Sequence, residues 1–195
     1  MKTPKLDIRK LTKKEIEQFF IDHRCPRFRA IQLYDWLWKH REVNFDNMTN
    51  LSIQNRDLLL NNFTINPLYI SQKNVSIDGT VKFLFSLNTD PNKVVEGVLI
   101  PQLNRLTACI SSQVGCSLSC TFCATGKLKL HRNLTEGEIY DQAFLINQYS
   151  INHYNKPITN IVYMGMGEPF LNIKNVLMSI YHITGDHGMG MSPKR

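Results

Sequence analysis

Three cysteines stand close together in the chain, at positions 116, 120 and 123, in the pattern Cys-x3-Cys-x2-Cys. Three thiolates on one tight loop can each bind one iron of a cubane cluster, which leaves the fourth iron without a protein ligand and open for chemistry. The alternative is a structural zinc ion, which needs four ligands and would have to take His131 or Cys109 as the fourth. The pattern therefore favours an iron–sulfur cluster bound by Cys116, Cys120 and Cys123, with zinc as the second interpretation.

A second group of residues that could do chemistry is the stretch Gly165-Met166-Gly167-Glu168-Pro169. By itself this stretch is a glycine-rich turn with one carboxylate, and a plain tight turn explains it equally well. Its position makes it more specific, because it follows the cysteine loop after one predicted helix and one predicted strand. In that position the stretch becomes a candidate binding loop.

The elements that must position these two loops follow a regular order. A predicted strand at 107–111 precedes the cysteine loop, which runs to about residue 132. Thr135, with Glu138 three residues later, predicts a capped helix to about residue 150. Residues 158–164 form a predicted buried strand, and a further helix is predicted at 172–183. This order of strand, helix, strand and helix is typical of a parallel sheet with helices outside it.

The first 66 residues predict a small helical module. Thr12 and Glu15 form a capping-box pattern at the start of a helix that runs to about residue 22. Apolar residues at 28–38 repeat at helical spacing and predict a second helix to about residue 40, and a third is predicted at 52–62. The aromatic residues at this spacing are most simply core residues.

Between residues 68 and 100 the hydrophobic pattern changes to a period of two. Three runs rich in β-branched and aromatic residues predict a β-meander, at 69–77, 81–87 and 94–100. The chain is thus expected to divide into a helical module (1–66), a β-rich linker (67–101) and an α/β core (102–195). Because two βα units cannot bury both faces of a parallel sheet, we expect the chain to be the front portion of a longer fold.

Composition and charge exclude several classes of protein. With 43% apolar and 20% charged residues over 195 positions, the chain is expected to fold rather than to be disordered or fibrous. It has no apolar run of about 18 residues and no signal-peptide pattern, so we expect a cytoplasmic protein with reduced cysteines and no membrane contact. Residues 1–134 carry 19 Lys and Arg against 11 Asp and Glu. This bias suits binding to RNA, and it also suits an ordinary soluble surface.

The cysteine loop, directly after the first strand of a βα series, resembles that of the radical S-adenosyl-L-methionine (SAM) superfamily. Phe122, one residue before the last cysteine, fits the aromatic residue usual there, and the stretch at 165–169 resembles the superfamily's Gly-Gly-Glu-type motif. The resemblance implies a [4Fe-4S] cluster whose open iron binds the amino and carboxylate groups of SAM. It implies that Gly167 and Glu168 contact the SAM amino group, and that the α/β core is the first half of a partial (β/α) barrel.

Longer stretches narrow the resemblance to the RlmN family of RNA adenine-C2 methyltransferases. These stretches are RLTACISSQVGC at 105–116, RNLT at 132–135 and ITNIVYMGMGEP at 158–169. Pro169 favours this family over the related Cfr enzymes, which methylate C8 of the same ribosomal adenine and typically have Ala at that place. The resemblance implies methylation of adenine C2 in 23S rRNA and tRNA, with the helical module binding RNA.

Adenine C2 is an electron-poor carbon that cannot displace a methyl group from SAM, so the family uses a radical route with two SAM molecules. One SAM methylates a cysteine near the C-terminus, and a radical made from the second activates that methyl group to add to C2. Cys109 matches a second cysteine, which removes the C2 proton and then forms a disulfide with the first. An inert core thiol is the other interpretation of Cys109. Glu96 matches a candidate proton acceptor of the family, or it is a surface carboxylate.

No cysteine follows Cys123, so the methyl-carrying cysteine is missing, and we expect no methyl transfer by this chain alone. The resemblance implies a monomer that works with 23S rRNA, tRNA and a one-electron donor such as flavodoxin. Two other functions stay open. One is a zinc-stabilised RNA-binding module without catalysis, and the other is a different radical SAM enzyme that acts on a peptide or a small molecule.

Overall fold

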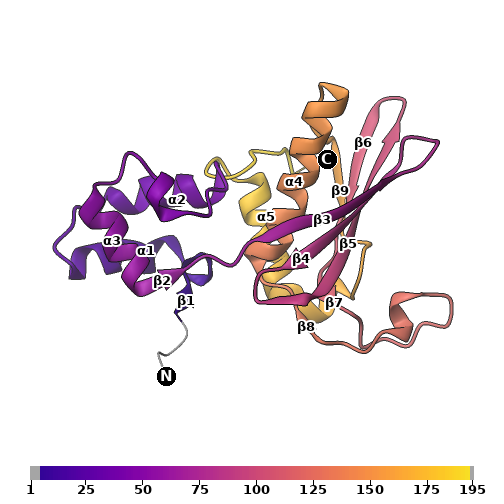
Figure 1. Ribbon diagram of the computed structural model, residues 1–195, viewed down its shortest axis with the longest axis horizontal. Coiled ribbons are helices and arrows are strands. Elements are labelled where there is room, and N and C mark those ends of the chain that lie inside the picture. The colour runs from indigo at the N-terminus through magenta and orange to yellow at the C-terminus, as the bar shows by residue number, and fades with distance from the viewer. Residues whose placement is uncertain (1–4, 194–195) are drawn as a thin grey trace.

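The computed structural model describes residues 5–193, and Figure 1 shows a helical part beside a part built on a β-sheet. The helical part contains β1 (Leu6–Asp7), η1 (Ile8–Lys10), α1 (Lys13–Asp22), α2 (Arg29–Trp38), η2 (Phe45–Asn47), α3 (Ile53–Asn62) and β2 (Phe63–Thr64). The second part contains β3 (Leu68–Val75), β4 (Val81–Leu87), β5 (Asp90–Gln102), β6 (Arg105–Cys109), β7 (Gln113–Val114), η3 (Thr125–Lys127), β8 (Arg132–Asn133), α4 (Glu136–Tyr154), β9 (Asn160–Val162), η4 (Pro169–Asn172) and α5 (Ile173–Thr184). None of the helices in the described residues is long and apolar enough to cross a membrane.

The helical part forms as its sequence predicts. At the start of α1 the Thr12 hydroxyl accepts a hydrogen bond from the Glu15 backbone nitrogen, and the Glu15 carboxylate accepts one from the Thr12 nitrogen at 2.7 Å, which confirms the capping box. α3 begins directly after its cap, Ser52. α2 ends at Trp38, two residues before its predicted end. The buried side chains of this part include Phe20, Leu33, Leu37, Trp38 and Leu59.

One five-stranded sheet joins the predicted linker to the predicted core. Its order is β3-β4-β5-β6-β9, with antiparallel pairing from β3 to β6 and parallel pairing of β6 with β9. The predicted meander is therefore confirmed, and it continues into the first strand of the core. β5 is longer than the predicted 94–100, because β4 pairs with its start and β6 with its end. β3 ends at Val75, two residues before its predicted end.

α4 covers one face of this sheet, as contacts with β3, β5 and β6 show. Phe83, Phe85 and Val95 point to the covered face and are fully buried, together with Ile139 and Ile146 of α4. The residues that alternate with them in the strands are exposed or half-buried. The sheet thus has one face covered by a helix and one open face.

The unit β6-α4-β9 confirms the predicted order of strand, helix and strand. The two strands pair in parallel, with Cys109 opposite Val162. α4 runs to Tyr154, about one turn beyond its predicted end, and terminates at Asn155 in the left-handed conformation. β9 covers only Asn160–Val162, and its residues are half-buried, which corrects the prediction of a buried strand at 158–164. The reason is that β9 is an edge strand of the sheet in the described residues.

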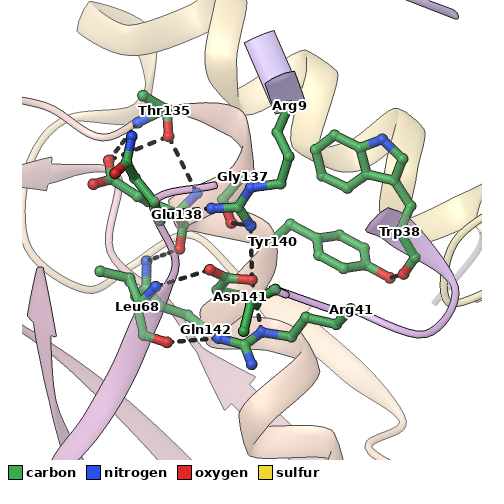
Figure 2. A network of polar contacts seen from close by, with 12 residues as sticks. Arg9, Trp38, Arg41, Leu68, Thr135, Gly137, Glu138, Tyr140, Asp141 and Gln142 are labelled. Carbon is green, nitrogen blue, oxygen red and sulfur yellow. Dashed lines mark hydrogen bonds and ion pairs between the residues drawn. The ribbon is translucent and has the colours of Figure 1, made fainter. Parts of the chain in front are cut away.

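A buried ion-pair network joins the helical part to α4 (Figure 2). The fully buried Asp141 carboxylate accepts hydrogen bonds from Arg9 Nη1 at 3.0 Å and from Arg41 Nε at 2.7 Å. It also accepts one from the Leu68 backbone nitrogen at 2.9 Å. Burial acts to lower the pKa of Arg9, but the carboxylates around it, that of Asp141 above all, hold this pKa above its ordinary value. Gly137 makes room for the guanidinium, because a Cβ there would lie 2.7 Å from Arg9 Cζ.

A second junction lies between α2 and α5. The imidazole of His182 stacks on the indole of Trp38, with ring centroids 3.5 Å apart and planes 7° apart. Burial, with the charge of Arg9 as a smaller cause, lowers the pKa of His182 to about 3, so the ring is neutral. The Tyr140 hydroxyl of α4 donates to the Trp38 carbonyl oxygen (Figure 2). Both long helices of the second part therefore pack against the helical part.

Candidate functional site

The cysteine loop leaves the sheet after β6 and returns before α4. Its base is closed by β7 and β8, which pair antiparallel with Gln113 opposite Asn133. Gly115 follows with a φ of +78°, and a Cβ there would overlap the Lys129 carbonyl group, so the position requires glycine. Beyond this base the loop reaches away from the sheet (Figure 1). The two paired strands were not predicted, because strands of two residues carry no periodic signal.

The three predicted cluster ligands lie along this loop. Cys116 and Cys123 are half-buried, Cys120 is exposed, and all three are free thiols. The Leu118 backbone nitrogen donates to Cys116 Sγ at 3.4 Å, and hydrogen bonds to sulfur of this kind tune iron–sulfur clusters. In the part of the chain that the structure describes, no three side chains of His, Cys, Asp or Glu lie close enough together to hold a single metal ion.

The donor set of the loop fits an iron–sulfur cluster. Cysteine thiolates are the ligands that such clusters take, and here three of them stand on one short segment. The segment is folded tightly on itself, because a Cβ at Gly126 would lie 2.9 Å from the Cys120 carbonyl oxygen. By the chemistry of their thiols, Cys116, Cys120 and Cys123 are residues that could hold such a cluster.

The loop at residues 165–169 lies directly against the segment that enters the cysteine loop. The Met166 carbonyl oxygen accepts hydrogen bonds from the backbone nitrogens of Ser112 at 2.9 Å and Gln113 at 3.2 Å. The Gly165 nitrogen donates to the Ile110 carbonyl oxygen at 3.0 Å. The two loops follow the carboxyl ends of the neighbouring parallel strands β6 and β9. Ligands of open α/β sheets bind at that edge.

Gly167 and Glu168, the predicted SAM contacts, lie at the centre of this second loop. The Glu168 backbone nitrogen donates to Gln113 Oε1 at 2.9 Å. Its carboxylate oxygen Oε1 accepts a hydrogen bond from the Phe170 nitrogen at 3.1 Å and so caps η4. Gly167 has a φ of +92°, a conformation that other residues rarely adopt. Glu168 is half-buried, and its backbone nitrogen is held by Gln113.

Cys109 and Glu96 lie on the open face of the sheet. Cys109 pairs with Val98, and Glu96 is two residues before Val98, so the three side chains share one face. Burial raises the pKa of the Cys109 thiol, and a hydrogen bond from the Met164 backbone opposes part of that rise. The Glu96 carboxylate lies 2.6 Å from Lys82 Nζ and is 42% exposed. All five cysteines of the chain are free thiols, and the disulfide partner implied for Cys109 is not among them, so the structure gives no support for that disulfide.

Two residues that hold the loops together were not predicted from the sequence. Ser111 and Gln113 are fully buried, and both use their side chains to bind the loop at 165–169. The available signal was the polar run Ser-Ser-Gln directly after an apolar strand. Buried polar side chains need hydrogen-bond partners, so such a run indicates a neighbouring segment that supplies them.

The sequence is similar to those of known proteins. Residues 6–65 match the model of the ribosomal RNA large subunit methyltransferase N-terminal domain. A probable dual-specificity RNA methyltransferase RlmN of Cytophaga hutchinsonii is 54% identical over 96% of this chain and 51% of its own length. A dual-specificity RNA methyltransferase RlmN of Buchnera aphidicola is 41% identical over 100% of this chain and 55% of its own length. The chain thus spans about half the length of the curated relatives it matches.

A solved structure shares the fold. A radical SAM methyltransferase from Sphaerobacter thermophilus superposes with a TM-score of 0.82 and 34% identity, over 97% of this chain and 55% of that one. This similarity confirms the predicted α/β fold of radical SAM type, with a partial sheet that does not close within the described residues. Identity of up to 54% along nearly the whole chain shows that the protein belongs to the RlmN family.

Proposed function

We propose that this chain forms part of a radical SAM enzyme that methylates C2 of adenine in 23S rRNA and tRNA. The observation that carries the proposal is the contact between the two loops. The Ser112 nitrogen donates to the Met166 carbonyl oxygen at 2.9 Å, which holds the start of the cysteine loop beside Glu168. The loop that carries the cysteines and the loop that carries Glu168 therefore begin at one edge of the sheet, the edge where α/β folds bind ligands.

The proposal gives each loop one task. Cys116, Cys120 and Cys123 hold a [4Fe-4S] cluster, and Gly167 and Glu168 bind the amino group of SAM. Cluster and SAM together supply the one-electron chemistry that adenine C2 requires, because this carbon is too electron-poor to act as a nucleophile. The Glu168 carboxylate offers a charged acceptor for the amino group. Gly167 has no side chain, so the backbone can approach the ligand closely.

Cys109 is the proposed group that takes the proton from adenine C2. Its thiol has a raised pKa because of burial, and the hydrogen bond from the Met164 backbone favours the thiolate that must form before Sγ can accept a proton. Glu96, whose carboxylate is held by Lys82 on the same open face, is the second candidate. In this proposal the target base reaches the open face after it leaves its stack.

The proposal that the substrate is RNA is supported by the excess of basic residues in the chain. Residues 1–134 carry 19 Lys and Arg against 11 Asp and Glu, and such an excess binds phosphates with release of counterions. We propose that residues 1–66 bind RNA, that 67–101 form a linker, and that 102–195 hold the cofactors.

We also propose that the enzyme acts as a monomer in the cytoplasm and receives electrons from a donor such as flavodoxin.

Anaerobic reconstitution with iron and sulfide tests the cofactor part of the proposal. We expect about four irons and four sulfides per chain and a broad brown absorption. Replacing Cys116, Cys120 or Cys123 by Ala should lower the iron content strongly. Cys25→Ala is the matched control, because Cys25 is a half-buried thiol outside the loop, and it should keep the cluster. One zinc and no iron would instead support a zinc-stabilised RNA-binding module.

A further inference from the structure

Three polar residues between β6 and the cysteine loop are buried. Ser111, Ser112 and Gln113 have exposed fractions of 0%, 2% and 1%. Buried polar groups are costly unless they find partners, and four hydrogen bonds of this segment go to the loop at 165–169. The segment is therefore built to bind that loop.

The side chains of this segment bind backbone groups of the second loop directly. Ser111 Oγ accepts a hydrogen bond from the Met166 nitrogen at 2.7 Å and donates to the Glu96 carbonyl oxygen at 2.6 Å. Gln113 Oε1 accepts a hydrogen bond from the Glu168 nitrogen at 2.9 Å. Gln113 Nε2 donates to Asn133 Oδ1 at 2.7 Å, on the strand that leaves the cysteine loop. Gln113 thus connects both ends of the cysteine loop to the peptide group of Glu168.

The two glycines of the second loop are required by this contact. A Cβ at Gly165 would lie 2.6 Å from Ser111 Oγ, and a Cβ at Gly167 would lie 2.6 Å from Gln113 Cγ. Both distances are shorter than van der Waals contact, so side chains at these positions would push the loops apart. The glycines therefore serve the close approach of two segments as well as the turn itself.

The buried segment is itself anchored to α4. Gln142, which is fully buried, accepts a hydrogen bond from the Ser111 nitrogen at 2.8 Å and donates to the Ser111 carbonyl oxygen at 3.0 Å. This pairing ties the segment to the helix that covers the sheet. A movement of the Glu168 peptide relative to the cysteine loop would have to break the hydrogen bonds from the loop at 165–169 to the buried side chains of Ser111 and Gln113.

We propose that Gln113 is a positioning residue for Glu168: its amide fixes the distance and orientation of the Glu168 peptide relative to the cysteine loop, and so prepares the carboxylate to bind the amino group of SAM. This inference deepens the proposed function and rests on it. Groups that orient the residues of a metal site typically change affinity or activity by roughly ten- to hundredfold when they are removed. The Gln113 amide makes its contacts to Glu168 and Asn133 with both of its polar atoms.

Two variants of Gln113 test the hydrogen bond. Gln113→Met keeps the length of the side chain and removes both hydrogen bonds, whereas Gln113→Glu keeps an acceptor for the Glu168 nitrogen. In the iron-free chain, amide hydrogen exchange measured by NMR should show the Glu168 proton exchanging roughly tenfold faster in Gln113→Met than in the wild type. Gln113→Glu should restore part of the protection. Gln72→Ala, on the exposed strand β3, is the control and should leave the exchange at Glu168 unchanged.

SAM binding to the cluster-loaded chain tests whether Gln113 prepares Glu168 to bind SAM. We expect Gln113→Met to keep its iron and sulfide and to bind SAM roughly tenfold or more weakly than the wild type, with Gln113→Glu between them. Unchanged SAM affinity in Gln113→Met, or loss of the cluster together with SAM binding, would overturn the positioning role. A wild-type chain that holds the cluster but binds no SAM would refute the proposed function, while amide exchange would still decide whether Gln113 holds Glu168.

Discussion

Asp141 ties the helical part to α4, and its charge is fully buried between two arginines. Asp141→Asn keeps the shape of the side chain and removes the charge that faces Arg9 and Arg41. Because the loss of one partner leaves buried charge uncompensated, the free energy of unfolding should fall by about 3–5 kcal/mol. Urea unfolding measures this change. Asp57→Asn, on the exposed face of α3, should change stability by less than about 0.5 kcal/mol.

The thiol of Cys109 offers a test of pH dependence at the residue scale. Only the thiolate reacts with iodoacetamide, and burial raises the pKa of this thiol in the folded chain. At a given pH the folded chain therefore holds less thiolate than the unfolded chain. Alkylation of Cys109, followed by mass spectrometry of its peptide, should need a higher pH in the cluster-free folded chain than in urea. Identical pH profiles would show that burial does not perturb this thiol.

Among the elements, those with local signals could be predicted from the sequence. α1 and α4 begin where Thr12 and Thr135 predict, because an N-cap acts on the backbone of its own first turn. β7 and β8 could not be predicted, since their pairing depends on a contact across a loop. The length and burial of β9 also depend on its position in the sheet, because within the described residues it lies at the edge and is less buried than its apolar sequence indicates.

His182 links two of these elements and predicts how their junction responds to acid. Its pKa is lowered from about 6.5 in the unfolded chain to about 3 in the folded one. Between these two pH values only the unfolded chain takes up the proton, which favours unfolding. The contribution of the neutral His182 ring to the stability of the folded chain is therefore complete above about pH 6.5 and is lost as the pH falls toward 3. The free energy of unfolding should drop by about 2 kcal/mol from pH 7 to pH 5 through this group.

Urea unfolding of His182→Gln at both pH values checks this prediction. The variant should be less stable at pH 7, because the ring stacked on Trp38 is lost, but its stability should depend less on pH. His153→Gln removes an exposed histidine of α4 and should keep the wild-type pH dependence. The same pH dependence in His182→Gln and the wild type would show that another group is responsible.

For the molecule as a whole, the sequence was sufficient for the family and for naming candidate cluster ligands, but not for the contact between the loops. Cys116, Cys120 and Cys123 are recognisable because their spacing is local. Gln113 is not, because its role depends on Glu168, 55 residues away in the chain. Contacts of this kind arise only when the parallel pairing of β6 with β9 brings two loops to one edge.

The charge of the whole molecule predicts salt-dependent binding to RNA. With an excess of basic residues in 1–134, affinity for a fragment of 23S rRNA should fall by about tenfold or more between 50 and 200 mM salt. Fluorescence anisotropy with labelled RNA measures this dependence, and an acidic protein of similar size is a suitable control. No binding even at 50 mM salt would favour a radical SAM enzyme that acts on a peptide or a small molecule.

The most direct measurement of the site as a whole is electron paramagnetic resonance of the reduced cluster, recorded with and without SAM. If Cys116, Cys120 and Cys123 hold a cluster with one open iron beside Glu168, SAM should change the spectrum. The Glu168→Gln variant should require more SAM for the same change, because the amino group loses a charged acceptor. A reduced cluster whose spectrum is the same at all SAM concentrations would contradict a shared cluster and SAM site.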